Sequence, residues 1–151
     1  MKSKSAIGII AILLLTTLTP SAVAGKPGTI PTLTGTLCKS FAGVWNAKVK
    51  TCFISGNSAS YVSFIIDSKS QLSIDPSGDF TNYYEITNNG SITNYGSFHT
   101  SNSIINIGNI VNMANFYSNY HITNNGFIWQ NGNWDGCVYN FNSFDGNLTL
   151  C

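Results

Sequence analysis

Residues 86–134 decide the fold of this 151-residue chain, because a six-residue pattern repeats through them without interruption. Residues 86–103 are ITNNGSITNYGSFHTSNS, residues 104–121 are IINIGNIVNMANFYSNYH, and residues 122–134 are ITNNGFIWQNGNW. The pattern begins at Ile74 and places an apolar residue at every sixth position up to Trp134. An amide mostly follows two positions later and a small residue four positions later. The repeating unit is therefore [Ile/Phe]-x-Asn-x-Gly-x.

A longer period of 18 residues overlies the first, because Phe80, Phe98, Phe116 and Trp134 are each 18 residues apart. On an α-helix, residues six apart would scatter around the cylinder. On a strand they return to one face, because side chains alternate with a period of two. The pattern therefore predicts an all-β solenoid of about 18 residues per coil. Residues one coil apart should stack, with ring on ring and amide on amide.

This pattern resembles the parallel β-helix built from hexapeptide repeats, which has three hexads per coil. The resemblance covers residues 62–136 and implies a left-handed coil. The usual hexad has a small or acidic residue directly after the aliphatic one, whereas this chain has Thr87, Thr93, His99 and Ile105 there. The many asparagines are also similar to the stacked ladders of right-handed β-helices.

The chain ends predict further segments around the solenoid. Residues 1–24 have two lysines, an apolar run and an Ala22-Val23-Ala24 cleavage signature, which together indicate a signal peptide. We expect residues 25–37 to form an extended leader, or a donor strand that pairs with another subunit, with a strand-like run at Thr32–Leu37. Residues 38–61 are interpreted as an amino-terminal cap in which Trp45 covers the first coil, and residues 137–151 as a carboxyl-terminal cap. About four coils lie between them.

The four cysteines are Cys38, Cys52, Cys137 and Cys151, an even number in a chain expected to be secreted or at the cell surface. Three pairings are possible. The equal spacing of 14 residues within each end favours Cys38–Cys52 and Cys137–Cys151.

Charge is scarce, since Asp, Glu, Lys and Arg together make up 9% of the chain and arginine is absent. This composition argues against a nucleic-acid partner, which requires a basic surface. The apolar run near the amino end is too short to span a bilayer, and we expect no membrane span in the mature chain. Asp67, Asp75, Asp79 and Glu85 are close in sequence, but their spacing matches no calcium loop. We expect no metal or cofactor.

No charged residue occurs from Ile86 to Trp134. Strict alternation directs several large side chains outward in this stretch, and together they form a candidate contact face. Its members are Tyr95, Ile105, Ile107, Val111, Met113, Phe127 and Trp129. The cap segments folding back over this face would be an alternative explanation for its apolar character. Asn89 and Asn147 begin glycosylation sequons, which matter only in a host with the required enzymes.

These features predict a non-enzymatic structural or adhesive protein that self-associates or binds a surface through the uncharged face. A solenoid that binds ice or polysaccharide is the alternative. Ice binding is disfavoured because Ile105 interrupts the column of Thr87 and Thr123. A sugar platform would need Tyr95, Tyr117 or Trp129 on one face. His99 and His121 are 22 residues apart and so belong to different columns.

Overall fold

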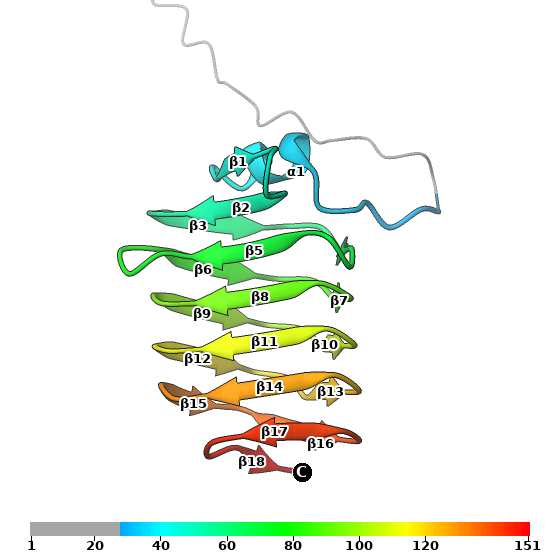
Figure 1. Cartoon of the computed structure of the whole chain (residues 1–151), viewed down its shortest axis with the longest axis vertical. Helices are drawn as coiled ribbons and strands as arrows, with labels where there is room; N and C mark the ends of the chain where they lie inside the picture. The colour runs from blue at the N-terminus through cyan, green and yellow to red at the C-terminus, as the bar shows by residue number, and fades with distance from the viewer. Residues whose placement is uncertain (1–27) are drawn as a thin grey trace, which may run out of the picture.

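The computed structural model describes residues 28–151, which form a stack of parallel β-coils (Figure 1). The expected signal peptide, residues 1–24, lies outside the described residues. None of the helices in residues 28–151 is long and apolar enough to cross a membrane.

Three sheets run the length of the stack and make a three-sided solenoid. The first, here sheet I, contains β1 (Val44–Asn46), β2 (Thr51–Ile54), β5 (Gln71–Ile74), β8 (Ser91–Asn94), β11 (Asn109–Asn112), β14 (Phe127–Gln130) and β17 (Ser143–Asp145). Sheet II contains β4 (Phe64–Ile66), β7 (Ile86–Asn88), β10 (Ile104–Asn106), β13 (Ile122–Asn124), β16 (Cys137–Asn140) and β18 (Thr149–Leu150). Sheet III contains β3 (Asn57–Ser60), β6 (Asp79–Asn82), β9 (Ser97–Thr100), β12 (Asn115–Ser118) and β15 (Asn133–Asp135).

The 18-residue register is confirmed in the middle of the stack. Phe80 pairs with Phe98, Phe98 with Phe116, and Phe116 with Trp134. The ring centroids of these pairs are 5.7, 4.8 and 4.2 Å apart. The three phenylalanines are fully buried, and the isoleucines of the six-residue pattern fill the other two inner walls.

Stacked amides form two ladders inside the coil, as the pattern predicts. In sheet II, Asn88 Nδ2 donates to Asn106 Oδ1 at 2.7 Å, and Asn106 Nδ2 donates to Asn124 Oδ1 at 2.7 Å. In sheet I, Asn94 donates to Asn112 and Asn112 donates to Gln130. A buried polar group is tolerated when it is hydrogen-bonded, so these ladders allow polar residues at interior positions.

The length of a coil changes along the stack. Sheet III strands lie 22 residues apart from β3 to β6 and 18 apart thereafter. The four-residue connections 67–70 and 75–78 replace the two-residue turns of later coils. Because of the insertion at 75–78, Ile74 aligns with Asn94, whereas Leu72 aligns with Ile92. The expected start of the aliphatic columns at Ile74 is therefore wrong, although Ile74 is buried.

The coil winds in a right-handed sense. In Figure 1, β5, β8 and β11 run toward the left in front, and the strands behind them return to the right as the chain descends. This differs from the left-handed coil that the hexapeptide resemblance implied. Either hand places the same residues inside, so the six-residue pattern does not distinguish them, and right-handed connection is usual between parallel strands.

The amino-terminal end of the solenoid is covered. Helix α1 (Gly35–Ser40) packs on β1, which pairs antiparallel with β2. The strand expected over Thr32–Leu37 is replaced by this helix and by a short parallel bridge between Thr32 and Ile65. The leader therefore pairs with its own chain at this point. Phe41 closes the aromatic column, since its ring lies 5.6 Å from that of Phe80, while Trp45 packs beside the helix.

The disulfides are Cys38–Cys52 at the covered end and Cys137–Cys151 at the other, which confirms the favoured pairing. Residues 137–151 do not fold over the last coil as a separate unit. They continue the coil as β16 in sheet II, β17 in sheet I and β18 in sheet II, in shorter coils and with no further strand in sheet III. The solenoid thus extends from β2 to β18 and has about five coils.

Candidate functional site

The structure brings six of the seven predicted contact residues to sheet I or its flanking turns. Val111, Phe127 and Trp129 lie on strands of sheet I. Ile107 lies in the turn that enters the sheet, and Tyr95 and Met113 lie in turns that leave it. Ile105 is the exception, because it belongs to β10 of sheet II.

Four of these residues form what we call the apolar wall: Ile107, Val111, Phe127 and Trp129. Val111 and Trp129 are paired in register on β11 and β14, and Phe127 pairs with Asn109. The side chains of Ile107, Phe127 and Trp129 are 53%, 37% and 39% exposed. Large apolar side chains gathered on one outer face are a common mark of an interaction surface.

Toward the amino end the outer face of sheet I is polar on β5 and β8, and Phe53 continues the column on β2. Thr93 aligns with Val111, and Ser73 aligns with Thr93. The side chain of Gln71 crosses this column, and its Nε2 donates to Thr93 Oγ1 at 2.8 Å. The apolar wall is therefore confined to the half of sheet I nearest the carboxyl end.

Apolar side chains of the last described coil are partly exposed. Phe144 aligns with Ile128 and Leu150 aligns with Val138, so both belong to inward-facing columns. Their side chains are 39% and 55% exposed. Trp134 and Leu148 are half-buried in the same part of the stack.

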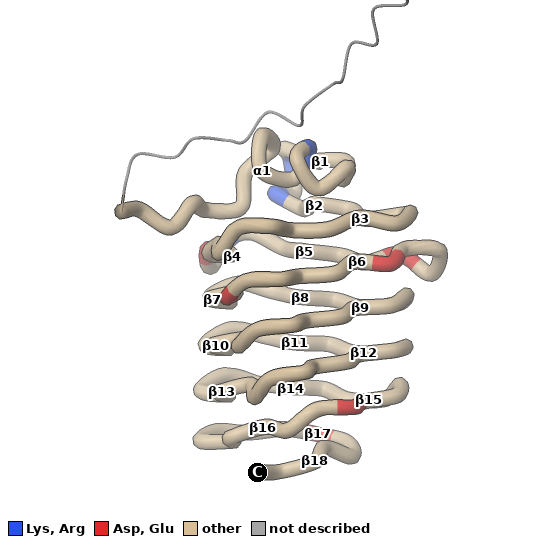
Figure 2. The backbone as a smooth tube through the Cα atoms, turned by 180° about the vertical axis from the view of Figure 1, so that it is seen from behind, with Lys and Arg blue, Asp and Glu red and all other residues tan. Residues whose placement is uncertain are grey.

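Charge in the described residues lies outside the middle coils, and Figure 2 shows acidic residues near β4, β6 and β7 as well as near β15. Residues 28–60 contain three exposed lysines, Lys39, Lys48 and Lys50, and no acidic residue. Residues 61–85 contain one lysine and four acidic residues, namely Asp67, Lys69, Asp75, Asp79 and Glu85. The uncharged coils of residues 86–134 follow, and Asp135 and Asp145 lie after them, both exposed.

Two separate groups of aromatic side chains lie on the side of the molecule where sheet III turns into sheet II, with Tyr139 on β16 of sheet II. The rings of Tyr61 and Tyr83 stack at 5.0 Å. Two coils further on, the His121 ring lies 4.6 Å from Tyr120 and 5.1 Å from Tyr139. We call these five residues the aromatic corner. Sequence reasoning missed it because its residues fall outside the six-residue pattern. The 18-residue alignment of the connections 83–85, 101–103 and 119–121 would have identified its position.

The residues proposed for a sugar platform do not share a face. Tyr95 lies in a turn after sheet I, Tyr117 lies on sheet III, where it stacks on His99 at 4.7 Å, and Trp129 lies on sheet I. The register also stacks Ile105 between Thr87 and Thr123, so the threonine column is interrupted as expected.

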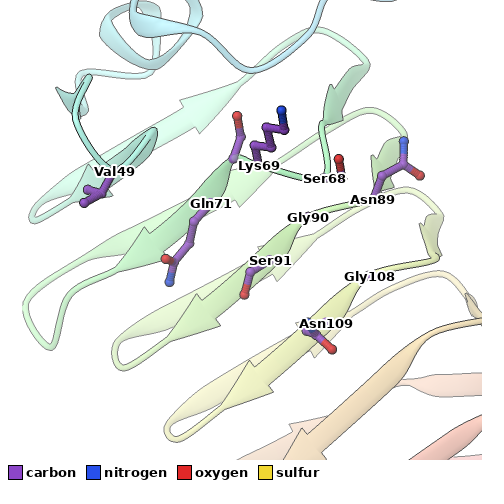
Figure 3. A pocket seen from close by; sticks show the side chains of 10 residues that line it. Val49, Ser68, Lys69, Gln71, Asn89, Gly90, Ser91, Gly108 and Asn109 are labelled. Carbon is purple, nitrogen blue, oxygen red and sulfur yellow. The ribbon is translucent and has the colours of Figure 1, made fainter.

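A polar pocket of about 290 Å³ lies beside the turns between sheets II and I (Figure 3). Its lining includes Lys69, Gln71, Asn89, Ser91 and Asn109 from consecutive coils. Lys69 is the only charged residue in the lining, and no histidine, cysteine or carboxylate joins it. The groups needed for acid–base or nucleophilic catalysis therefore do not converge there.

Asp67 lies in the four-residue connection next to this pocket. The backbone N–H of Lys69 donates to Asp67 Oδ1 at 2.9 Å, and this hydrogen bond lowers the pKa of the Asp67 carboxyl below its ordinary value. The carboxylate orders its own turn. Within residues 28–151, no group of three or more His, Cys, Asp or Glu side chains gathers as metal ligands would.

Comparison of the chain with protein-family models, with curated proteins and with solved structures gives no match.

Proposed function

We propose that this chain is an extracellular structural or adhesive protein that associates with other copies or with a surface through the apolar wall. The observation that carries the proposal is the absence of charge from Ile86 to Trp134 together with the outward position of Val111, Phe127 and Trp129 on the same sheet. Exposed charge is the usual protection of β-proteins against association, and the wall residues carry none, with Asp145 on β17 aligned beside Trp129 at the edge of the wall. The two disulfides fit an oxidising compartment.

The double variant Phe127→Ser/Trp129→Ser tests the wall. Sedimentation of the wild-type protein over a wide concentration range, together with adsorption to an apolar surface, should show association that the variant weakens about tenfold or more, because two large apolar contacts are lost. Tyr83→Ser/Tyr139→Ser is a matched control, since it removes two exposed aromatic rings from another face. A wild-type protein that stays monomeric and unadsorbed at every concentration would overturn the proposal.

Polysaccharide binding is the second candidate, and the aromatic corner favours it. Tyr61, Tyr83, Tyr120 and Tyr139 are 44–68% exposed, so their ring faces and hydroxyls are accessible. Tyrosine combines an apolar ring with a hydrogen-bonding hydroxyl, which suits the faces and edges of sugars. In a glycan array, binding should be lost in Tyr83→Ser/Tyr139→Ser and retained in Phe127→Ser/Trp129→Ser. Equal loss in both variants, or no glycan bound by the wild type, would exclude this candidate.

A further inference from the structure

We propose that the polar pocket between sheets II and I is a separate binding site, which takes an acidic sugar residue of a polysaccharide. The pocket is lined by residues from the turn before β2 to the start of β11. None of its lining residues belongs to the apolar wall or to the aromatic corner. Binding at this site therefore does not depend on self-association or on the exposed tyrosines.

The pocket lies where the connection before β5 is longer than the equivalent turns of the following coils. Residues 67–70 form a four-residue connection, whereas residues 89–90 and 107–108 form two-residue turns. The longer connection contributes Ser68, Lys69 and Ser70 to the lining, and the turn before β2 adds Val49. The volume of about 290 Å³ is at the lower end of the range for sites that hold small ligands.

Hydrogen-bonding side chains stand in a row along the pocket. Gln71, Ser91 and Asn109 are aligned in register on β5, β8 and β11, and Figure 3 shows them on consecutive coils. Neighbouring strands are about 4.8 Å apart, so the row extends over about 10 Å, which is longer than one sugar ring. Asn89 adds an amide from the turn before β8. Such a row suits a polysaccharide, because its hydroxyl groups also recur at regular intervals.

The side chains of this row have unused hydrogen-bonding capacity. Within residues 28–151, the side chains of Asn89, Ser91 and Asn109 make no hydrogen bond. Gln71 donates its Nε2 to Thr93, and its Oε1 accepts no hydrogen bond from the described residues. The interior amides of the two ladders, in contrast, bond to the amides of neighbouring coils. A few polar groups that converge on a pocket are what fixes the orientation of a polar ligand.

The charges next to the pocket favour an anionic sugar over a neutral one. Lys69 is exposed and lines the pocket, and Lys48 and Lys50 lie in the turn before β2. Asp67 is the carboxylate of the same connection. The hydrogen bond from the Lys69 backbone N–H and the charge of Lys50 both lower the pKa of the Asp67 carboxyl. This carboxylate is therefore engaged by its own turn, and three basic residues remain against one acidic residue.

The other acidic residues of these coils lie at different places on the solenoid. Asp75 follows β5 at the end of the strand opposite to the pocket, where sheet I leads into sheet III. Asp79 begins β6 of sheet III, and Glu85 precedes β7 and accepts a hydrogen bond from Ser103. Four residues of extended chain, about 13 Å, separate Gln71 from Asp75. This separation exceeds the screening length of about 8 Å at physiological salt, so positive charge predominates at the pocket.

Calorimetric titration with uronic acids tests the site, using galacturonic and mannuronic acid and their linear trimers. We expect the wild-type protein to bind at least one trimer about tenfold or more tightly than its monomer, because the row of side chains is longer than one ring. Lys69→Gln should weaken trimer binding about tenfold, since a charge-assisted hydrogen bond is lost. The methyl-esterified trimer should bind the wild type equally weakly. Lys39→Gln is the matched control, because Lys39 is exposed and does not line the pocket.

A second pair of variants tests the amide row. Asn89 and Asn125 both precede a glycine in the turn between sheets II and I, and both are exposed, but only Asn89 lines the pocket. Asn89→Ala should weaken trimer binding about fivefold, and Asn125→Ala should leave it unchanged. The protein for these titrations is produced without N-glycosylation, because Asn89 begins a sequon.

Several results would overturn this proposal. They are the absence of trimer binding, equal affinity for monomer and trimer, and unchanged affinity in Lys69→Gln. Oligoglutamate bound as tightly as the trimer would overturn it too, because the site would then recognise charge alone.

The wall variant Phe127→Ser/Trp129→Ser and the corner variant Tyr83→Ser/Tyr139→Ser separate this site from the other two. Trimer binding should be unchanged in both variants. A wild type that stays monomeric and unadsorbed would refute the apolar-wall proposal and leave the pocket standing. Loss of trimer binding in the wall or corner variant, with Lys69→Gln unaffected, would refute the pocket instead.

Discussion

Asn106 illustrates how a single amide becomes an interior residue of this fold. It is fully buried, accepts a hydrogen bond from Asn88 and donates one to Asn124. Its side chain also donates to the backbone oxygens of Gly108 and Phe127 at 3.3 Å. Each amide therefore bonds the next coil and a turn at once. Isoleucine could fill the same volume but could not satisfy these backbone oxygens.

We expect Asn106→Ala to lower the free energy of unfolding by about 2–3 kcal/mol, because the change breaks the ladder and leaves buried partners with fewer hydrogen bonds. The exposed Asn125 of the neighbouring turn is the matched control, and Asn125→Ala should lie within about 0.5 kcal/mol of the wild type. Urea unfolding followed by circular dichroism measures both. Similar losses in the two variants would show that the ladder has no special role.

Asp67 provides a pH-dependent contribution at the same scale. Because the pKa of its carboxyl is lower in the folded chain, the hydrogen bond from Lys69 stabilises the turn above the unfolded pKa and is lost as the pH falls through the folded value. The melting temperature of Asp67→Asn should therefore approach that of the wild type in strong acid and lie below it at neutral pH. A difference independent of pH would contradict this assignment.

Strands in this molecule are short, and the turns between them determine how closely successive coils approach. At the corner between sheets II and I, Gly90, Gly108 and Gly126 stack above one another. A Cβ placed on Gly108 would lie 2.1 Å from the carbonyl oxygen of Gly90, and a Cβ on Gly126 would meet Gly108 in the same way. The backbone cannot move away from such a Cβ without separating the paired strands. This corner therefore has no room for a side chain larger than that of glycine.

Gly108→Ala should therefore destabilise the protein by about 2–3 kcal/mol through overpacking. Gly56→Ala is its control, because Gly56 has negative-φ or extended backbone and no atom lies within 4 Å of its added Cβ. That variant should be neutral or stabilised by about 0.5 kcal/mol, since alanine restricts the unfolded chain. Thermal unfolding of the pair tests the argument, which would fail if Gly108→Ala were as stable as Gly56→Ala.

The sequence predicted the elements best where the spacing was regular. Phe80, Phe98 and Phe116 could be placed in one column because no insertion separates them. Leu72 could not be aligned with Ile92, because two extra residues in the connection 75–78 place Ile74, by coincidence, six residues before Phe80. The handedness of the coil depends on the geometry of its turns, and the identity of the inward-facing residues does not reveal that geometry.

Part of the candidate site was also predictable from the regular spacing of the strands. Alternation correctly directed Val111 and Trp129 outward, since strand geometry alone decides this. The continuation of the coil through residues 137–151 could not be foreseen, because Cys137 and Cys151 have the same spacing as the pair that does belong to a cap. Only the register of β16 to β18 shows that these residues pair as strands of the stack.

At the scale of the whole molecule, the two disulfides differ in what they hold. Cys38 and Cys52 are fully buried and join helix α1 to the first coil. Cys137 and Cys151 hold β18 to β16, and β18 pairs with no other strand. The first bridge therefore supports the contact on which every later coil depends, whereas the second supports only the final strand.

Replacing Cys38 and Cys52 by alanine should lower the free energy of unfolding by about 3 kcal/mol, the loop-entropy value for a loop of this length. Replacing Cys137 and Cys151 should cost less in global unfolding and should mainly increase hydrogen exchange at Thr149 and Leu150, because that strand can open alone. Denaturant titration and hydrogen exchange measure the two effects. A larger global loss from the second pair would contradict this division.

The covered first coil has a consequence for how the chain is made. Synthesis starts at the amino end, so the residues of helix α1 and β2 exist before those of the later strands. Each later coil can then fold against the strand edges of the coil that precedes it. Folding coil by coil from the covered amino-terminal end forms contacts only between neighbouring coils. It therefore avoids the pairing of residues far apart in sequence, which slows the folding of many β-proteins.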